Sequence, residues 1–314
     1  MRVAVVGAGG LGGYFGGRWA AAGLDVVFLA RGAQLAALRA RELRIASPLG
    51  DVALRVRAED RAAAIGEVDL VLVATKTWQL AEAAAGLAPL LGGGTAVVGV
   101  QNGVEASAVL SAAVGAERVL AGTCRIISYL AAPGEIRHVG VQPTLTFGEL
   151  SGGASERCER IRDALARGGG MTVRLADDIE AEIWRKFLFF APVSGIGAVT
   201  QAPVGVWRRI DEVRERLVAA MEEVRAVAAA RGVTLPEDLV SESLDFLDRL
   251  PPEGTSSLQR DVRDGRRTEL EALCGAMVRL GREHGVATPA HAAVYAFLLP
   301  RELHAQGVVD WPVG

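Results

Sequence analysis

The sequence has few of the residues that disulfide frameworks and metal sites require. Its three cysteines are Cys124, Cys158 and Cys274, and its four histidines are His138, His284, His291 and His304. The cysteines are far apart and form no C-x-x-C pair, so we expect buried free thiols and a reducing cytoplasm rather than disulfides. The histidines form no i, i+4 pair and have no neighbouring set of carboxylates, so no metal site is predicted.

The sequence also lacks an excess of basic residues and an unbroken apolar segment. Lysine and arginine number 34 against 37 aspartates and glutamates, for a net charge of -3, so nucleic acid is not expected as a partner. Residues 187–207 carry no charge, but prolines and glycines interrupt them, which favours a buried helix and a loop over a membrane span. The chain begins "MRVAVVGAGG", without the pattern of a signal peptide, so no export is expected.

The length of the chain, 314 residues, predicts two domains, because one hydrophobic core rarely grows beyond about 250–300 residues. In the first half, short apolar runs alternate with helical patterns, as in a parallel sheet with crossover helices. These runs are residues 2–7, 25–30, 69–75 and 95–100. Residues 119–148 contain a Pro-Gly turn between two β-rich runs and predict an antiparallel extension of that sheet.

From Asp178 onward the pattern is helical almost throughout, and no internal repeat of fixed period is present. We therefore predict an α/β fold with a Rossmann-type parallel sheet, an antiparallel extension and an all-helical C-terminal part. The predicted domains are residues 1–176, which contain the sheet, and residues 177–314, which are helical.

The first apolar run ends in "GAGGLG", which matches G-x-G-x-x-G at Gly7, Gly9 and Gly12. Gly7 permits a tight turn, Gly9 lets backbone amides approach a pyrophosphate, and Gly12 allows close packing of helix on strand. A strand before the motif and a helix after it favour a dinucleotide site over a simple glycine-rich turn. The residues predicted to bind the phosphates are Gly7, Ala8, Gly9, Gly10, Leu11 and Gly12.

Arg31 stands at the end of the second predicted strand, where an NAD-selective site has Asp or Glu for the ribose 2′-hydroxyl. A guanidinium there suits the 2′-phosphate, so the predicted cofactor is NADP(H); the alternative is an arginine that is merely solvated. Lys76 and Gln79 follow the third strand and Asn102 the fourth, so all should share the carboxyl edge of the sheet. The alternatives are that Lys76 is a solvated strand end and that Asn102 only forms a turn with Gly103.

A lysine lies within the apolar segment "EIWRKFLFFAPVSG" at 182–195. At about 100° per residue, Lys186 falls on the side of Phe190 and Val193 and away from the polar residues of the helix. A desolvated ammonium is costly unless it has a partner or a chemical role, so Lys186 is a candidate functional group. The alternative is a lysine whose stem packs on the core while its head reaches water. Pro192 is predicted to interrupt or bend this helix.

Glu269 is a candidate functional carboxylate at the start of a later helix. Thr268 and Glu271 match the T-x-x-E capping box, which gives Glu271 a structural role and leaves Glu269 available for a site. The alternative for Glu269 is a surface residue that stabilises the helix dipole.

Together these motifs give the chain a family resemblance. It resembles ketopantoate reductase (2-dehydropantoate 2-reductase) over nearly its whole length, and "SSLQRDVRDGRRTE" is the most specific segment. The other matching segments are "GAGGLG", "TKTWQ", "QNG", "IWRK" and "REHGVATP". The resemblance implies a Rossmann domain, an all-helical domain and NADPH-dependent reduction of a branched 2-oxo acid.

The resemblance also implies roles for individual residues. Lys186 matches the family's general acid, Glu269 its glutamate after R-x-T, and Ser257 its substrate-binding serine. Asn102 matches the asparagine of "QNG", and Lys76 and Gln79 match the lysine and glutamine of K-x-x-Q. Lys186 and Glu269 are therefore the predicted catalytic residues.

Two positions depart from the family pattern. Where the family has two asparagines that contact the substrate, four and eight residues after the lysine, this chain has Phe190 and Ser194. Helical spacing places both on the face of Lys186. The predicted substrate-binding residues are Asn102, Lys186, Phe190, Ser194, Ser257 and Glu269.

Other readings of the same residues stay open. One is a paralogue that acts on another branched 2-oxo acid, and a second is a non-catalytic NADPH-binding sensor or assembly protein. A third is a dehydrogenase of 3-hydroxy acids, in which the order of the site residues should differ. The sequence leaves open whether the chain is a monomer or a homodimer.

Overall fold

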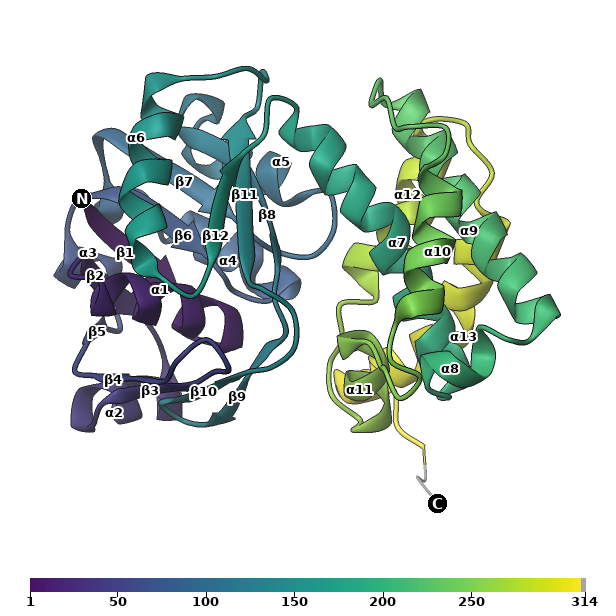
Figure 1. Ribbon diagram of the computed structural model, residues 1–314, viewed down its shortest axis with the longest axis horizontal. Helices are drawn as coiled ribbons and strands as arrows, with labels where there is room; N and C mark the ends of the chain where they lie inside the picture. Colours follow the sequence, from purple (N-terminus) through teal and green to yellow (C-terminus); the bar gives the residue numbers. More distant parts are fainter. Residues whose placement is uncertain (312–314) are drawn as a thin grey trace. The chain divides into compact units, whose positions relative to one another are not determined.

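The computed structural model describes residues 1–311, and these form two compact units (Figure 1). The first unit comprises residues 1–101 and 105–180, and the second comprises residues 102–104 and those from 181 onward. The tripeptide Asn102–Val104 thus belongs to the second unit, although the chain on both sides of it belongs to the first.

The first unit is built on a mostly parallel sheet with the strand order β12-β11-β8-β7-β6-β1-β2-β5. Its strands are β1 (Arg2–Val6), β2 (Asp25–Leu29), β5 (Arg57–Glu59), β6 (Val68–Val73), β7 (Leu91–Gly99), β8 (Val119–Arg125), β11 (Thr144–Glu149) and β12 (Thr172–Leu175). Every neighbouring pair is parallel except β8 with β11. The predicted α/β class and the antiparallel extension at β11 are confirmed.

Helices cover both faces of this sheet (Figure 1). The α-helices of the unit are α1 (Gly10–Ala21), α2 (Gly32–Ala40), α3 (Ala62–Ile65), α4 (Leu80–Ala85), α5 (Ala106–Val114) and α6 (Glu156–Leu165), and its 3-10 turns are η1 (Thr77–Gln79), η2 (Ala88–Leu90), η3 (Ala116–Arg118) and η4 (Ala166–Gly168). Because side chains alternate along a strand, Val3 and Val5 join the core under α1 and α6, while Ala4 and Val6 join the core under α3, α4 and α5. The near-continuous apolar runs of the sequence reflect this burial on both faces.

A second, smaller sheet in the same unit has the strand order β4-β3-β10-β9. Its strands are β3 (Leu43–Ala46), β4 (Val52–Leu54), β9 (Ser128–Ala132) and β10 (Glu135–His138). The Pro-Gly turn joins β9 to β10 as predicted, but this hairpin does not extend the main sheet, so that part of the prediction is wrong. The hairpin packs on α1 instead: a Cβ at Gly13 would lie 2.7 Å from Cδ1 of Ile136 and one at Gly17 would lie 2.6 Å from Cδ1 of Ile45, so these glycines let the small sheet approach the helix closely.

The described residues of the second unit form helices joined by loops, and no strand is present among them. Its helices are α7 (Ile179–Thr200), α8 (Val204–Trp207), α9 (Asp211–Ala230), α10 (Leu239–Arg249), α11 (Ser257–Arg263), α12 (Ala276–Glu283) and α13 (Pro289–Ala305), and a π-helical turn, η5 (Glu271–Gly275), precedes α12. Its core contains large buried side chains such as Trp184, Phe187 and Trp207. All three cysteines of the chain are buried and free, as predicted.

Helix α7 continues through Pro192, so the proline does not interrupt the helix, and a bend at this position stays a prediction. A proline removes one backbone donor, but Leu188, Ala191 and Ala198 are buried on both sides of it, and their packing favours an unbroken helix. Along residues 1–311, no helix combines the length and the apolar character that a membrane span needs.

Candidate active site

The glycine loop lies between β1 and α1, and its shape fits a dinucleotide phosphate. Gly7 has φ +98, and a Cβ there would lie 2.9 Å from the backbone of Ala74, while a Cβ at Gly12 would lie 2.0 Å from the carbonyl oxygen of Gly7. Gly9 is the N-cap of α1, and a Cβ there would meet nothing within 4 Å. The loop is therefore packed tightly against the sheet but open over Gly9, where backbone amides can approach an anion.

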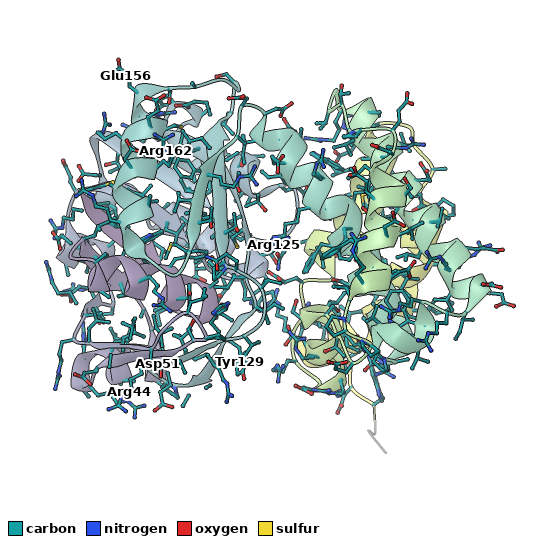
Figure 2. The ribbon with its side chains drawn as sticks, viewed as in Figure 1. Arg44, Asp51, Arg125, Tyr129, Glu156 and Arg162 are labelled. Atoms are coloured by element: carbon teal, nitrogen blue, oxygen red, sulfur yellow. The ribbon has the colours of Figure 1, made fainter. Side chains whose placement is uncertain are left out.

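The second sheet forms a wall beside this loop. A Cβ at Gly10 would lie 2.7 Å from Cα of Tyr129, which stands on β9 in the same small sheet that carries Arg44 on β3 (Figure 2). The carbonyl of Ala8 accepts a hydrogen bond from Gln34 at 2.7 Å, and Gln34 in turn accepts one from the backbone of Gly134 at 2.8 Å. Gln34 thus ties the loop to the β9–β10 hairpin, a role that no local sequence signal indicated.

Two buried hydroxyl groups next to this loop are left without a hydrogen-bond partner among residues 1–311. They belong to Thr75, whose backbone nitrogen is 2.9 Å from a Cβ built at Gly7, and to Ser128, whose carbonyl is 2.8 Å from one built at Gly10. Buried polar groups normally have partners, so orphaned hydroxyls at an open phosphate cradle suit a polar ligand. The residues present therefore fit a dinucleotide.

The predicted cofactor residues Arg31, Lys76 and Gln79 lie at the carboxyl edge of the main sheet, because β1, β2 and β6 are adjacent and parallel. Arg31 precedes α2, and its guanidinium is 2.6 Å from the carboxylate of Glu82, with both side chains well exposed. The ammonium of Lys76 lies 5.5 Å from the ring centroid of Trp78, and Gln79 is exposed at the end of η1.

Asn102 makes its hydrogen bonds within the second unit. The ammonium of Lys186 donates to Asn102 Oδ1 at 3.1 Å, and Asn102 Nδ2 donates to Glu269 Oε2 at 2.9 Å. The amide therefore bridges a cation and a carboxylate, with its oxygen toward the positive end and its N–H toward the negative end. Glu269 is 7% exposed, so its charge is poorly hydrated and depends on such partners.

The remaining predicted substrate residues have different surroundings. The ammonium of Lys186 lies 5.5 Å from the ring centroid of Phe190, within the range of a cation–π contact. Ser194 is 1% exposed, and its hydroxyl has no partner among residues 1–311. Ser257 is the half-buried first residue of α11, and within the described part of the chain it shares no hydrogen bond with Asn102, Lys186 or Glu269.

The predicted capping box at Thr268 and Glu271 is not formed. Thr268 donates from its backbone nitrogen and its hydroxyl to Glu302 on α13, and the carboxylate of Glu271 accepts from Arg279 and from Tyr295. Burial, followed by the bond to Glu271, raises the pKa of Tyr295 to about 12. Local spacing misses this arrangement because Glu302 lies 34 residues along the chain and takes the backbone N–H of Thr268 that Glu271 would have bonded in a capping box.

A second buried carboxylate, Glu223 on α9, holds the other end of α13. It accepts from the backbone nitrogens of Ala290 and His291 at 2.6 and 3.0 Å and from His291 Nδ1 at 2.7 Å. Burial alone would raise the pKa of Glu223, but these hydrogen bonds outweigh burial and lower it. Within residues 1–311, no group of three or more His, Cys, Asp or Glu could hold a metal ion.

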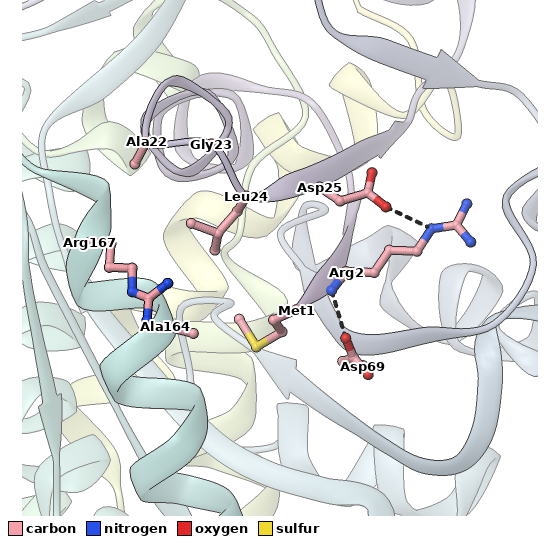
Figure 3. Close-up of a pocket in the computed structure, with 9 residues that line it drawn as sticks. All are labelled: Met1, Arg2, Ala22, Gly23, Leu24, Asp25, Asp69, Ala164 and Arg167. Atoms are coloured by element: carbon pink, nitrogen blue, oxygen red, sulfur yellow. Dashed lines mark hydrogen bonds and ion pairs between the residues drawn. The ribbon is translucent and has the colours of Figure 1, made fainter.

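A hollow of about 430 Å³ in the first unit is lined by none of the predicted site residues (Figure 3). Its lining includes Arg2, Asp25 and Asp69, which stand at or beside the amino ends of β1, β2 and β6, and Arg2 Nε is 3.4 Å from Asp25 Oδ2. Ligands of open parallel sheets bind at the opposite, carboxyl ends of the strands, so we assign this hollow no part in the site.

Comparison with known proteins places the chain in one family. The family model of ketopantoate reductase PanE/ApbA matches residues 3–152, and that of its C-terminal domain, ketopantoate reductase PanE/ApbA C terminal, matches residues 178–302. The uncharacterized oxidoreductase YkpB of Bacillus subtilis (strain 168) is 32% identical over 298 residues, which cover 95% of this chain and 98% of YkpB.

Two further relatives carry the family's name. The 2-dehydropantoate 2-reductase of Mesorhizobium japonicum is 32% identical and is matched over 95% of this chain and 97% of its own. The crystal structure of a PanE/ApbA family ketopantoate reductase from Ralstonia eutropha JMP134 is 30% identical with a TM-score of 0.89, over 98% of this chain and 100% of that chain. The chain therefore belongs to the ketopantoate reductase family and is a 2-dehydropantoate 2-reductase-like oxidoreductase that acts on a CH–OH group.

Proposed function

We propose that this chain reduces a 2-oxo acid to the 2-hydroxy acid with NADPH, and that Lys186 is the general acid. The observation that carries the proposal is the hydrogen-bonded chain from Lys186 through Asn102 to Glu269. The carboxylate of Glu269 balances the positive charge of Lys186 through the neutral amide of Asn102. The amide oxygen also gives the ammonium a fixed acceptor, which sets the direction of its N–H groups. In this proposal the first unit binds the cofactor and the second unit carries the catalytic residues.

When bound, the cofactor would supply a hydride to C2 of the 2-oxo acid. Negative charge then grows on the carbonyl oxygen, where the ammonium of Lys186 stabilises it and donates the proton. Asn102 orients the ammonium, Glu269 orients Asn102, and Ser257 would donate to the substrate carboxylate. The backbone of Gly7–Gly12, together with Arg31, Lys76 and Gln79, would hold the dinucleotide.

The first test removes the ammonium. Lys186→Ala should lower kcat by about 10² to 10⁴, the usual range for a general acid, without weakening NADPH binding. The matched control is Arg185→Ala, which removes the neighbouring cation on α7, partnered by Glu242 at 3.8 Å, and should change kcat less than about twofold. A Lys186→Ala enzyme with normal single-turnover rates would contradict the assignment. Tight NADPH binding without turnover of any 2-oxo acid in a panel would favour the sensor reading.

The second test concerns the cofactor. Arg31 and Glu82 are 72% and 65% exposed, and exposed ion pairs contribute only about 0–1 kcal/mol, so a 2′-phosphate can replace Glu82 as the partner of Arg31. We expect NADPH to bind at least about tenfold more tightly than NADH, which corresponds to about 1.4 kcal/mol. Arg31→Glu should abolish the preference, whereas Glu82→Gln should keep or increase it. Equal dissociation constants for the two cofactors in the unmodified protein would refute this assignment.

A further inference from the structure

A buried carboxylate on α13, outside the proposed catalytic residues, binds the residue that precedes Glu269. Glu302 is 6% exposed, and its Oε2 accepts from the backbone nitrogen of Thr268 at 2.9 Å and from the Thr268 hydroxyl at 2.6 Å. Its Oε1 accepts from Gln306 at 2.6 Å, and Arg267 Nε lies 4.0 Å away. Both carboxylate oxygens are therefore used, which offsets the cost of burying the charge.

These bonds fix the backbone on the N-terminal side of Glu269. Because one oxygen receives both the N–H and the O–H of Thr268, the main chain and the side-chain rotamer of Thr268 are set together. The same hydroxyl accepts a hydrogen bond from the backbone nitrogen of Leu270 at 3.1 Å. This bond joins the two residues on either side of Glu269.

The C-terminal side of Glu269 is also fixed. Its carbonyl accepts from the backbone nitrogens of Ala272 and Leu273, both at 3.1 Å, where the π-helical turn η5 begins. Because the backbone is held on both sides of Glu269, the position of its Cα is fixed, and its carboxylate is placed to accept the hydrogen bond from Asn102.

We propose that Glu302 is a positioning residue for the reduction, acting through Thr268 on Glu269 and thereby on Asn102 and Lys186. This inference rests on the proposed function. Glu302 touches neither reactant, so its contribution lies in the geometry of the amide-bridged pair. Displacements of about 1 Å can cost about 10² in rate, so a change at Glu302 should affect turnover more than ligand affinity.

The test uses substitutions at both ends of the contact in the full-length protein, with NADPH and either ketopantoate or 2-oxoisovalerate. Glu302→Ala and Thr268→Val should lower the single-turnover rate by about 10- to 100-fold. The conservative Glu302→Gln and Thr268→Ser should stay within about threefold, because each keeps a group that can make the same bond. The dissociation constant of NADPH should stay within about twofold in all four variants.

The matched control is Glu223→Ala. It removes a comparably buried carboxylate on α9 that bonds the opposite, N-terminal end of α13. It should lower thermal stability and leave the rate within about threefold. Hydrogen exchange gives a readout independent of activity, because the amides of Thr268 and Leu270 should exchange faster in Glu302→Ala than in Glu223→Ala. Equal rate losses in Glu302→Ala and Glu223→Ala would show that Glu302 only stabilises the fold, which would overturn the proposal.

A double-mutant cycle separates this inference from the proposed function. If Glu302 acts through Glu269, adding Glu302→Ala to Glu269→Ala should cost less than about a further threefold. The same loss in both backgrounds would overturn the inference. A normal rate for Lys186→Ala would instead contradict Lys186 as the general acid, and the Glu302–Glu269 comparison does not depend on that result. If Glu302→Ala does not fold, Thr268→Val against Thr268→Ser decides the question in the same cycle.

Discussion

Phe190 places an aromatic ring 5.5 Å from the ammonium of Lys186, at a position where the family resemblance implies an asparagine. Such a contact stabilises a cation by about 0.5–2 kcal/mol, but a ring cannot pair a substrate hydroxyl as an amide does. Ser194, one helical turn further along α7, is buried and can replace at most one of the lost hydrogen bonds. In the proposed site, apolar volume therefore stands where the resemblance implies polar recognition.

This substitution predicts weak discrimination among substrates. A pocket that pairs a hydroxyl rejects an analogue without it, because the pocket's own polar groups are left unpaired. We therefore expect kcat/KM for ketopantoate and for 2-oxoisovalerate, which lacks the 4-hydroxyl, to lie within about tenfold of each other. Steady-state comparison of the two acids measures this. Phe190→Asn should increase the preference for ketopantoate and Phe190→Leu should not; a preference above about 10³ in the unmodified protein would show that other residues bind the hydroxyl.

Local sequence signals located single residues of the site but not their partners. The helical pattern of 182–195 put Lys186 on the apolar side of α7, and the glycine motif located the loop after β1. The acceptor of Lys186 lies 84 residues away, and Asn102 and Glu269 are separated by 167. Neither contact leaves a periodic or spacing signal, and for the same reason the capping box was predicted where Glu302 binds Thr268.

Among the elements, η5 provides the surface on which the tripeptide Asn102–Val104 rests. Gly103 has φ +106, and a Cβ there would lie 2.9 Å from the carbonyl oxygen of Ala272 in η5. This backbone conformation strains any L side chain, and the carbonyl of a helical turn cannot easily move aside. Gly103 therefore lets the chain approach η5 closely, which places Asn102 beside Glu269.

A matched pair of glycine substitutions tests this contact. Gly103→Ala combines backbone strain with a clash, whereas Gly232→Ala, at φ +81 with nothing within 4 Å, has strain alone. We expect Gly232→Ala to cost about 1 kcal/mol of stability and leave kcat unchanged. Gly103→Ala should cost more and also lower kcat by about tenfold or more, because it displaces Asn102. Equal effects on kcat would show that close packing on η5 does not position the asparagine.

The sequence predicted most of the order of helices and strands, but it did not predict which strands pair in the second sheet. The four apolar runs became β1, β2, β6 and β7, since a doubly buried parallel sheet leaves a strong local pattern. The second sheet was missed because β3 and β4 are short and β9 and β10 read like any hairpin. Its position depends on glycines of α1, which were interpreted only through the dinucleotide motif.

Each unit of the molecule contains a carboxylate that should make the stability of the protein depend on pH. In the first unit, hydrogen bonds from Arg157, and a lesser one from Ser155, lower the pKa of Glu149 and tie β11 to the start of α6. In the second unit, the pKa of Glu223 is also lowered. A depressed pKa means that the folded state favours the ionised form, so this stability is present above the ordinary value of 4.5 and is lost as the pH falls below it.

Removing either carboxylate should therefore destabilise the protein more at neutral pH than in acid. At pH 7, Glu149→Gln and Glu223→Gln should each destabilise the protein by about 1.5–3 kcal/mol, the usual contribution of hydrogen bonds to a charged group. The difference from the unmodified protein should shrink as the pH drops from 5 to 3, because the native carboxylates then become neutral as well. Thermal unfolding followed across this range measures it. A destabilisation that stays constant with pH would mean that packing, and not ionisation, explains the loss.

The excursion of Asn102–Val104 into the second unit has a consequence for the timing of biosynthesis. Asn102 leaves the ribosome well before Glu269, the partner 167 residues downstream. At about 5–20 residues per second, this interval lasts roughly 8–33 s, during which the surrounding sheet of the first unit can fold. The tripeptide stays without its partner Glu269 during that interval, so the hydrogen-bonded chain from Lys186 through Asn102 to Glu269 forms only after residue 269 has been synthesised. A nascent chain can therefore fold the sheet around the tripeptide before the amide of Asn102 meets its carboxylate partner.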